Sequence, residues 1–247
     1  MASRAEILST LTQWLAPDDF KDYCPNGLQV EGSAQVSRII SGVTASRALI
    51  DAAIEADADM ILVHHGYFWK GEDQAIRGMK RARIQRLLEH DINLVAYHLP
   101  LDDHPQYGNN RQLAKVLNIL DPRPLDGLVW EGELDTPLTP SEFEERIAGA
   151  LNRPPLYVGS GPEKISRVGW CTGAAQGFID KALEAGLDAY ISGEISEPTT
   201  HTARECGIHY YAAGHHATER YGVQALGRAL EEVFGVEHRF IDCDNPV

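Results

Sequence analysis

The sequence predicts an α/β protein of two linked α/β lobes with similar strand-helix-strand topology. Residues 50–59 (I-D-A-A-I-E-A-D-A-D) and 179–188 (I-D-K-A-L-E-A-G-L-D) are identical at six of ten positions. Each segment lies in a run of short apolar stretches separated by helical stretches, a pattern that favours parallel sheets with right-handed crossovers. The repeat indicates either a common origin of the two halves or two similar amphipathic units.

The elements of the first half follow from local patterns. An amphipathic helix is expected near the N-terminus, where Ser3 and Glu6 form a capping box. The apolar run M-I-L-V before His64 and the run I-N-L-V-A-Y before His98 are predicted strands, with helical stretches between them.

The second half repeats this order. The runs A-Y-I-S-G-E and I-H-Y-Y-A-A-G are predicted strands, and a capping box at Thr139 and Glu142 begins a helix that runs to about Leu151. Val223 to Phe234 continues a helix that begins near His216, and V-E-H-R-F-I-D-C alternates as a terminal strand would.

We place the first lobe at residues 1–125 and the second at residues 126–247, with the final strand free to return to the first lobe. Residues 121–139 are rich in proline, glycine and acidic side chains and are expected to link the lobes.

Composition indicates an ordinary cytoplasmic globule. The 247 residues are 43% apolar and 23% charged, and no apolar run reaches the roughly 18 residues of a membrane span. The N-terminus lacks a signal-peptide core, and the four cysteines are widely spaced without a C-x-x-C pair. Reduced thiols and no membrane partner are therefore expected.

A formal charge of -14 argues against general nucleic-acid binding, which requires a basic surface. Residues 77–86 are a local exception, with five basic side chains in ten positions. This run is either a solvated helix face or an anion-binding rim. In the second interpretation Lys70, Arg77 and Lys80 would bind the substrate.

Histidines and carboxylates follow the predicted strands and indicate a two-metal site. His64 and His65 follow one apolar run, Asp102 lies just beyond another, and His215 and Glu219 follow a third. Ligand sites of open α/β sheets form at the carboxyl ends of strands, so these side chains are expected in a metal cleft between the lobes. Nitrogen and oxygen donors of this kind accept Zn, Fe, Mn or Ni.

The two carboxylate ligands have competing interpretations. Asp103 competes with Asp102 but also fits a helix N-cap, and Glu219 also fits a first-turn glutamate, although its i+4 spacing from His215 favours ligation. His98 and His216 are candidate proton-transfer residues. His104 and Glu194 are further candidates for residues that orient the ligands, whereas His201, His209 and His238 are expected to be structural.

No nucleophile elbow, Walker loop or H-E-x-x-H motif is present. Any hydrolysis would therefore use metal-bound hydroxide, because a metal ion can lower the pKa of water to about 7.

The motifs resemble those of the GTP cyclohydrolase I type 2-like family, also called the Ngg-interacting-factor-three-like family, and its short bacterial YbgI-like members. The similarity rests on P-N-G-L-Q-V-E-G, G-V-T-A-S, H-H-G-Y-F-W-K-G, H-L-P-L-D and G-H-H-A-T-E-R, which occur in this order over nearly the whole chain. Two departures are Gly66, where many members have proline, and the lack of room for the extra domain of longer members.

The resemblance implies two lobes, a dinuclear metal centre and ring-shaped hexamers built from dimers. Carried over by position, the ligands of the two divalent ions would be His64, His65, Asp102, His215 and Glu219, with Glu219 bridging both ions. The family label implies hydrolysis of a nucleotide or related heterocycle, with formate released from C8 of guanine in the cyclohydrolase version.

Two alternatives remain open. The protein is either a metal-dependent hydrolase of a small molecule or a non-catalytic metal-binding scaffold that forms a ring-shaped oligomer. Tyr67, Phe68 and Trp69 are expected either to form a patch for self-association or to line the substrate cleft.

Overall fold

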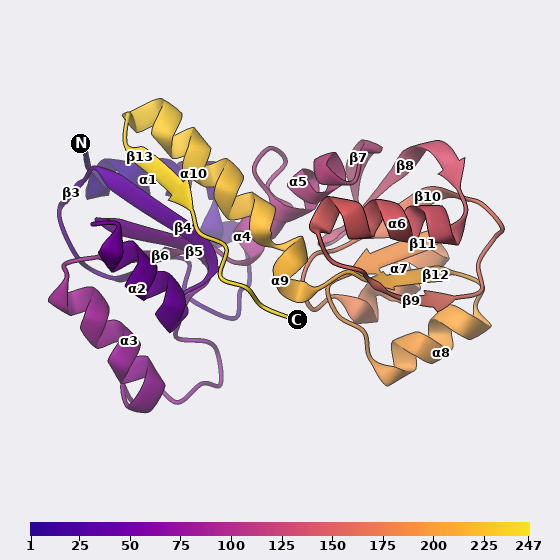
Figure 1. The fold of residues 1–247 in the computed structure, drawn as a ribbon, viewed down its shortest axis with the longest axis horizontal. Coiled ribbons are helices and arrows are strands. Elements are labelled where there is room, and N and C mark those ends of the chain that lie inside the picture. The colour runs from indigo at the N-terminus through magenta and orange to yellow at the C-terminus, as the bar shows by residue number, and fades with distance from the viewer. The chain divides into compact units, whose positions relative to one another are not determined.

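The computed structural model describes the chain from Met1 to Val247 and confirms the predicted α/β class (Figure 1). Two compact units are present. Unit 1 comprises Met1–Gly108 and Gly222–Asp244, and unit 2 comprises Asn109–Tyr221 and Asn245–Val247. Each unit contains one main sheet. No helix combines the length and the apolar composition that a membrane span requires.

Unit 1 is built around a five-stranded sheet in the order β13-β4-β5-β6-β2. The first four strands are mutually parallel, and β2 is antiparallel to β6. The strands of this sheet are β2 Gly27–Val30, β4 Arg38–Thr44, β5 Met60–His65, β6 Asn93–Ala96 and β13 Glu237–Phe240. A separate two-stranded sheet pairs β1 Ala2–Ser3 with β3 Gln35–Val36. The helices are α1 Arg4–Leu15, α2 Arg47–Glu55, α3 Gly78–Glu89, α4 Leu99–Asp103 and α10 Arg220–Phe234, with a 3-10 turn η1 at Pro17–Asp19.

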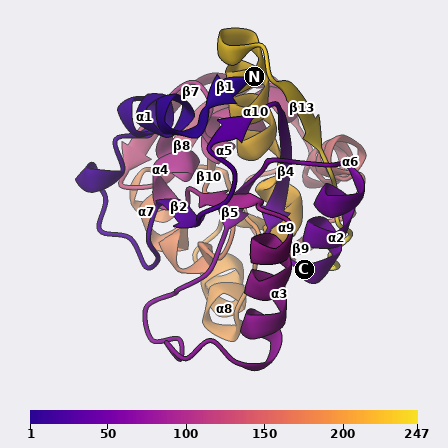
Figure 2. The ribbon, with the colours of Figure 1, turned by 90° about the vertical axis from the view of Figure 1, so that its left-hand side faces the viewer.

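Helices cover both faces of this sheet because its strands are apolar on both sides. Met60 and Leu62 of β5 pack with residues of α1 and α10, whereas Ile61 and Val63 pack with residues of α2 and α3. In Figures 1 and 2 α2 and α3 lie side by side on one face of the sheet. The alternation follows from the two-residue period of a strand.

Unit 2 is built around a six-stranded sheet in the order β7-β8-β10-β11-β12-β9. Strands β10, β11 and β12 are parallel, and β9 is antiparallel to β12. The strands are β7 Ile119–Asp126, β8 Val129–Leu138, β9 Leu156–Gly159, β10 Ile165–Trp170, β11 Ala189–Ser192 and β12 His209–Ala212. The helices are α5 Asn109–Val116, α6 Pro140–Leu151, α7 Ile179–Glu184, α8 Glu197–Glu205 and α9 His215–Thr218, with a 3-10 turn η2 at Gln176–Phe178.

The two copies of the predicted repeat share one hydrogen-bonding arrangement, in which an aspartate accepts from two backbone N–H groups. Asp59 and Asp188 occupy equivalent positions of the repeat, each just before the middle strand of a parallel trio. The Asp59 carboxylate accepts hydrogen bonds from the backbone N–H groups of Ser37 and Arg38, at 2.7 and 3.0 Å. The Asp188 carboxylate accepts from Ser166 and Arg167, both at 2.8 Å. Each aspartate therefore fixes the start of the preceding parallel strand.

The local helix signals are confirmed. Ser3 and Glu6 cap α1, and Thr139 and Glu142 cap α6, which ends at Leu151 as predicted. The terminal strand is also confirmed, because β13 pairs with β4.

The interpretation of residues 121–139 as an inter-lobe linker is wrong. These residues form most of a β-hairpin, in which β7 pairs antiparallel with β8. Pro122 and Pro124 are tolerated because β7 is an edge strand, where a missing N–H costs no hydrogen bond. The proposed division into residues 1–125 and 126–247 falls inside β7, next to this hairpin's turn, and the compact units divide the chain at other residues.

Candidate metal centre

Three histidines of unit 1 gather at the carboxyl end of its parallel strands. His64 and His65 are the last residues of β5, and His98 precedes α4 as its N-cap. Each offers a ring nitrogen, and these nitrogens all lie within 4.8 Å of one another. The ring centroid of His64 is 4.6 Å from that of His65 and 5.1 Å from that of His98. The sequence predicted that His64 and His65 follow the same strand, and in the structure His98 lies beside them.

A carboxylate lies next to this cluster. Asp102 is buried on α4, and its Oδ1 is 3.4 Å from Nε2 of His64, which is also fully buried. Pro100 occupies the first turn of α4, where its missing N–H costs nothing. The short helix therefore directs the predicted carboxylate towards a predicted histidine.

Each histidine is held through Nδ1. Nδ1 of His64 donates to the carbonyl oxygen of Tyr97 at 3.0 Å, and Nδ1 of His65 contacts Oγ1 of Thr44 at 3.2 Å. Nδ1 of His98 donates to Oδ1 of Asp22 at 2.6 Å. A donor proton on Nδ1 leaves the lone pair on Nε2, which is the usual arrangement behind a metal-binding imidazole.

Asp22 was not predicted, although it organises this group. Its side chain is only 4% exposed. It accepts hydrogen bonds from His98, from Nδ2 of Asn26 at 2.9 Å and from the backbone N–H of Leu99 at 3.0 Å. Burial alone would raise the pKa of Asp22, but the hydrogen bonds from His98 and Asn26 and the charge of His98 lower it to about 2. Asp22 is therefore a carboxylate at neutral pH and anchors both His98 and the start of α4.

Unit 2 presents a second set of donors after β12. His215 is the first residue of α9 and Glu219 is its C-cap. Nε2 of His215 is 3.2 Å from Oε2 of Glu219, as the i+4 spacing predicted. Nδ1 of His215 contacts Oε1 of Glu194 at 2.7 Å. Glu194 follows β11, at the position that corresponds to His65 in the repeat.

Glycine leaves space around these donors. Gly173 has a φ of +70°, and a Cβ built there would lie 2.2 Å from Oε1 of Glu219 and 3.2 Å from Nε2 of His215. Its backbone is held by Ser192, whose hydroxyl donates to the Gly173 carbonyl at 3.0 Å, and by Thr218, whose hydroxyl accepts from the Gly173 N–H at 3.1 Å. Any side chain at this position would intrude on the two donors.

The charge of this set favours a bound cation. Burial alone would lower the pKa of His215, but hydrogen bonds and charges from Glu219 and Glu194 outweigh burial and raise the pKa to about 9. Two carboxylates thus attract positive charge to the imidazole. Histidine nitrogen beside buried carboxylate oxygen is a donor set that suits Zn, Fe, Mn or Ni, so the residues present fit a divalent metal.

The other histidines have distinct surroundings. His216 is buried on α9 beside His215. His104 stacks on Tyr107, with ring centroids 4.9 Å apart, and His209 contacts the hydroxyl of Tyr157 at 2.9 Å. His238 contacts the hydroxyl of Ser41 at 2.8 Å. The last two have structural partners, in keeping with the role expected for them.

Of the three basic residues predicted to bind substrate, Arg77 and Lys80 form ion pairs with neighbouring acidic side chains. Nζ of Lys80, a buried side chain, lies 2.9 Å from Oε1 of Glu72, and Arg77 pairs with Asp73 at 2.6 Å. Lys70 is exposed, and its backbone N–H donates to the carbonyl oxygen of Tyr23 at 2.6 Å. Lys70 and Arg77 both keep their side chains at the surface, and Lys70 lies on the loop that follows His65.

The two α/β units and their histidine-carboxylate groups define an α/β protein with candidate metal-binding sites. The chain belongs to the Duf34/NIF3 (NGG1p interacting factor 3) family, whose model matches residues 2–246, and this confirms the resemblance seen in the motifs. A relative from Pseudomonas aeruginosa, described as "GTP cyclohydrolase 1 type 2 homolog", is 57% identical over 251 residues, covering 98% of this chain and 99% of its own. A relative of the same description from Escherichia coli K12 is 52% identical, with 98% of each chain covered.

Solved structures of similar sequence share this fold. A structure described as "protein ybgI, unknown function" matches with a TM-score of 0.97 and 50% identity, covering 100% of both chains. The protein TTHA1606 from Thermus thermophilus matches with a TM-score of 0.93 and 32% identity, again over 100% of both chains.

Proposed function

We propose that this protein is a metal-dependent hydrolase that acts on a nucleotide or a related heterocycle. In this proposal two divalent ions are held by His64, His65, Asp102, His215 and Glu219. The observation that carries it is the donor chemistry of each unit: three histidines beside a buried aspartate in unit 1, and a histidine between two glutamates in unit 2. A bound divalent ion would supply a water molecule of lowered pKa and polarise the bond to be broken.

The chain's own residues would position the substrate and move protons. His98 is a suitable proton acceptor at Nε2, because Asp22 holds the proton of Nδ1 on the opposite side of the ring. His216 stays a second candidate for this role. Lys70 would contact an anionic group of the substrate, whereas Arg77 and Lys80 would have to exchange Asp73 and Glu72 for it.

The substrate class is supported by the relatives' descriptions as homologues of GTP cyclohydrolase 1 type 2. In the cyclohydrolase version, one water molecule opens the imidazole ring of guanine between C8 and N9. A second water molecule then releases C8 from N7 as formate.

Incubation of metal-loaded protein with GTP, followed by a formate assay, tests this version. The expected result is formate release that is lost in His64→Ala and His215→Ala. Turnover no higher than in these variants would eliminate the cyclohydrolase version, and a wider screen of phosphoesters and amides would then test the hydrolase class.

A non-catalytic metal-binding scaffold is the second candidate. It is favoured by the pairing of Arg77 and Lys80 with acids of their own loop, which leaves few cations ready for a phosphate. Any metal-dependent turnover that Glu219→Gln abolishes would rule this candidate out.

A further inference from the structure

Two aromatic side chains of unit 1 flank the three-histidine cluster. The ring centroid of Trp69 is 4.9 Å from that of His98 and 5.8 Å from that of His65, and the Trp69 and His98 planes cross at 83°. Tyr23 approaches His98 from another loop, with centroids 6.4 Å apart and planes at 63°. Tyr23 is 59% exposed, although an aromatic side chain would gain stability from burial.

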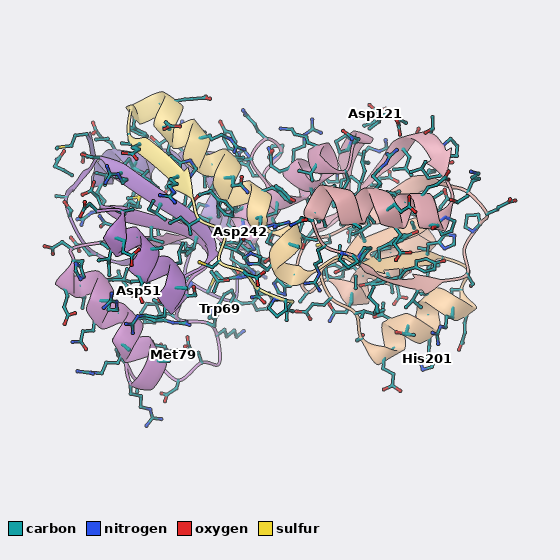
Figure 3. The ribbon with its side chains drawn as sticks, in the orientation of Figure 1. Asp51, Trp69, Met79, Asp121, His201 and Asp242 are labelled. Atoms are coloured by element: carbon teal, nitrogen blue, oxygen red, sulfur yellow. The ribbon has the colours of Figure 1, made fainter.

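The loop from Gly66 to Gly71 sends its aromatic residues in different directions. Tyr67 is 5% exposed and its hydroxyl donates to the carbonyl of Ala45 at 2.8 Å, while Phe68 packs against the same core cluster. Trp69 instead contacts the histidines, and Figure 3 labels it on this loop between β5 and α3. The loop therefore does not present a contiguous three-residue patch for self-association.

The position of Trp69 is fixed by several contacts. Its backbone N–H donates to Oε2 of Glu72 at 3.1 Å, and its indole N–H donates to the carbonyl of Gly66 at 3.2 Å. Phe68 adopts a φ of +66°, a left-handed conformation that is unfavourable for an aromatic residue and that recurs at functional sites.

Gly66 contributes because the loop packs closely on β6. A Cβ built at Gly66 would meet Oε1 of Gln29 at 2.1 Å and Cβ of Ala96 at 2.7 Å. Oε1 of Gln29 accepts the Tyr67 N–H at 2.6 Å, so a larger residue at position 66 would disturb the loop.

The two aromatic residues belong to loops that are joined directly. The Lys70 N–H donates to the carbonyl oxygen of Tyr23 at 2.6 Å, which ties the Trp69 loop to the Tyr23 loop. The same contact places the backbone of the exposed Lys70, which follows Trp69 in the chain, beside the backbone of Tyr23. Aromatic faces bind planar rings by stacking, and a nearby ammonium favours a ligand that also carries negative charge.

We propose that Tyr23 and Trp69 form a ring-binding subsite that selects a substrate with a planar heterocycle, and that Lys70 binds an anionic group attached to that ring. This inference rests on the proposed function for the identity of the site. It assigns to Tyr23 and Trp69 a binding role that depends on the ring of the ligand, not on its phosphate.

Equilibrium binding to the metal-loaded protein tests the subsite without requiring turnover. The probes are guanosine 5′-monophosphate, which has ring and phosphate, and ribose 5-phosphate, which lacks the ring. Trp69→Leu and Tyr23→Ala are the test variants, and each is also checked for metal content. Trp14→Leu is the matched control, because Trp14 is a partly buried tryptophan of the same unit that contacts Tyr107.

We expect Trp69→Leu to weaken binding of guanosine 5′-monophosphate by roughly 5-fold to 150-fold, the range for loss of one stacking contact. Tyr23→Ala should weaken it in the same direction, while ribose 5-phosphate binding, metal content and the Trp14→Leu control stay unchanged. Unchanged nucleotide affinity in both test variants, or no nucleotide binding by the wild type, would overturn the subsite. Loss of metal from Trp69→Leu would also overturn it, because Trp69 would then support the histidines. Absence of turnover with intact ring-dependent binding would instead count against the hydrolase proposal alone.

Discussion

The candidate metal-binding histidines and His98 are each held at Nδ1 by a group that is distant in the sequence. Tyr97, Thr44 and Asp22 contact the histidines of unit 1, and Glu194 contacts His215. The sequence named the histidines because they follow apolar runs. The repeat predicted Glu194, because it corresponds in position to His65. Asp22 could not be predicted, because it lies 76 positions from His98 in the chain.

Replacement of Glu194 by glutamine tests this orienting role. The amide keeps the size of the side chain but removes the charge that favours a proton on Nδ1 of His215. Metal affinity should fall by about 10-fold to 100-fold, as is usual when such a partner is lost. A chelator competition titration measures this change. Glu197→Gln, an exposed acid on α8, is the control, and equal affinities in the two variants would contradict the role.

His238 should make stability depend on pH. Burial lowers the pKa of His238, with Glu231 opposing and Arg228 adding to this effect. Because the folded pKa is below the unfolded value of 6.5, the unfolded chain binds more protons as the pH falls. The contribution of neutral His238 is therefore complete above about pH 6.5 and is lost as the pH falls towards its folded pKa.

Urea unfolding at about pH 7.5 and about pH 5.5, on either side of the unfolded pKa, checks this expectation. His238→Gln should lose less stability between these pH values than the wild type does. His90→Gln, which changes an exposed histidine of the same unit, should behave as the wild type. An identical pH dependence in His238→Gln and wild type would count against it.

At the scale of secondary-structure elements, local signals predicted well and composition predicted poorly. The capping boxes of α1 and α6 depend on residues three positions apart, so they are visible in the sequence. The hairpin β7–β8 was missed because its prolines and acidic residues are typical of loops. Only its place at the edge of the sheet makes Pro122 and Pro124 acceptable there.

Asp59 and Asp188, which precede the middle strand of each parallel trio, should contribute to the stability of the fold. Asp59→Ala removes the acceptor for the N–H groups of Ser37 and Arg38. We expect a loss of about 0.5–1.5 kcal/mol in the free energy of unfolding, the usual net contribution of a hydrogen bond, because the exposed Ser37 N–H can bind water once the carboxylate is removed. Urea denaturation gives the value, with Asp57→Asn in the same turn as the control, because Asp57 has a φ of +49° and asparagine tolerates this left-handed conformation. A loss no larger than that of the control would show that the arrangement is dispensable.

At the scale of the whole molecule, topology is what the sequence predicted best. The order strand-helix-strand-helix-strand occurs in both units, as β4-α2-β5-α3-β6 and as β10-α7-β11-α8-β12. Candidate ligands follow these strands in both units. The contribution of Gly173 could not be predicted, because its importance depends on a positive φ and on its closeness to Glu219.

We propose that the chain forms a homohexamer, as the family resemblance implies. A formal charge of -14 per chain opposes association, so stable rings would require closed interfaces that bury apolar surface. Light scattering at micromolar concentration should give a mass of about six chains. A mass near the 27.3 kDa of one chain would refute the proposal.

We propose that donors from both units bind metal. Elemental analysis of protein purified without chelator or nickel resin tests it most directly. We expect two divalent ions per chain in the wild type and a clear loss in both His64→Ala and His215→Ala, with circular dichroism showing that each variant is folded. A wild-type chain without bound metal, or folded variants that keep the full metal content, would contradict the claim.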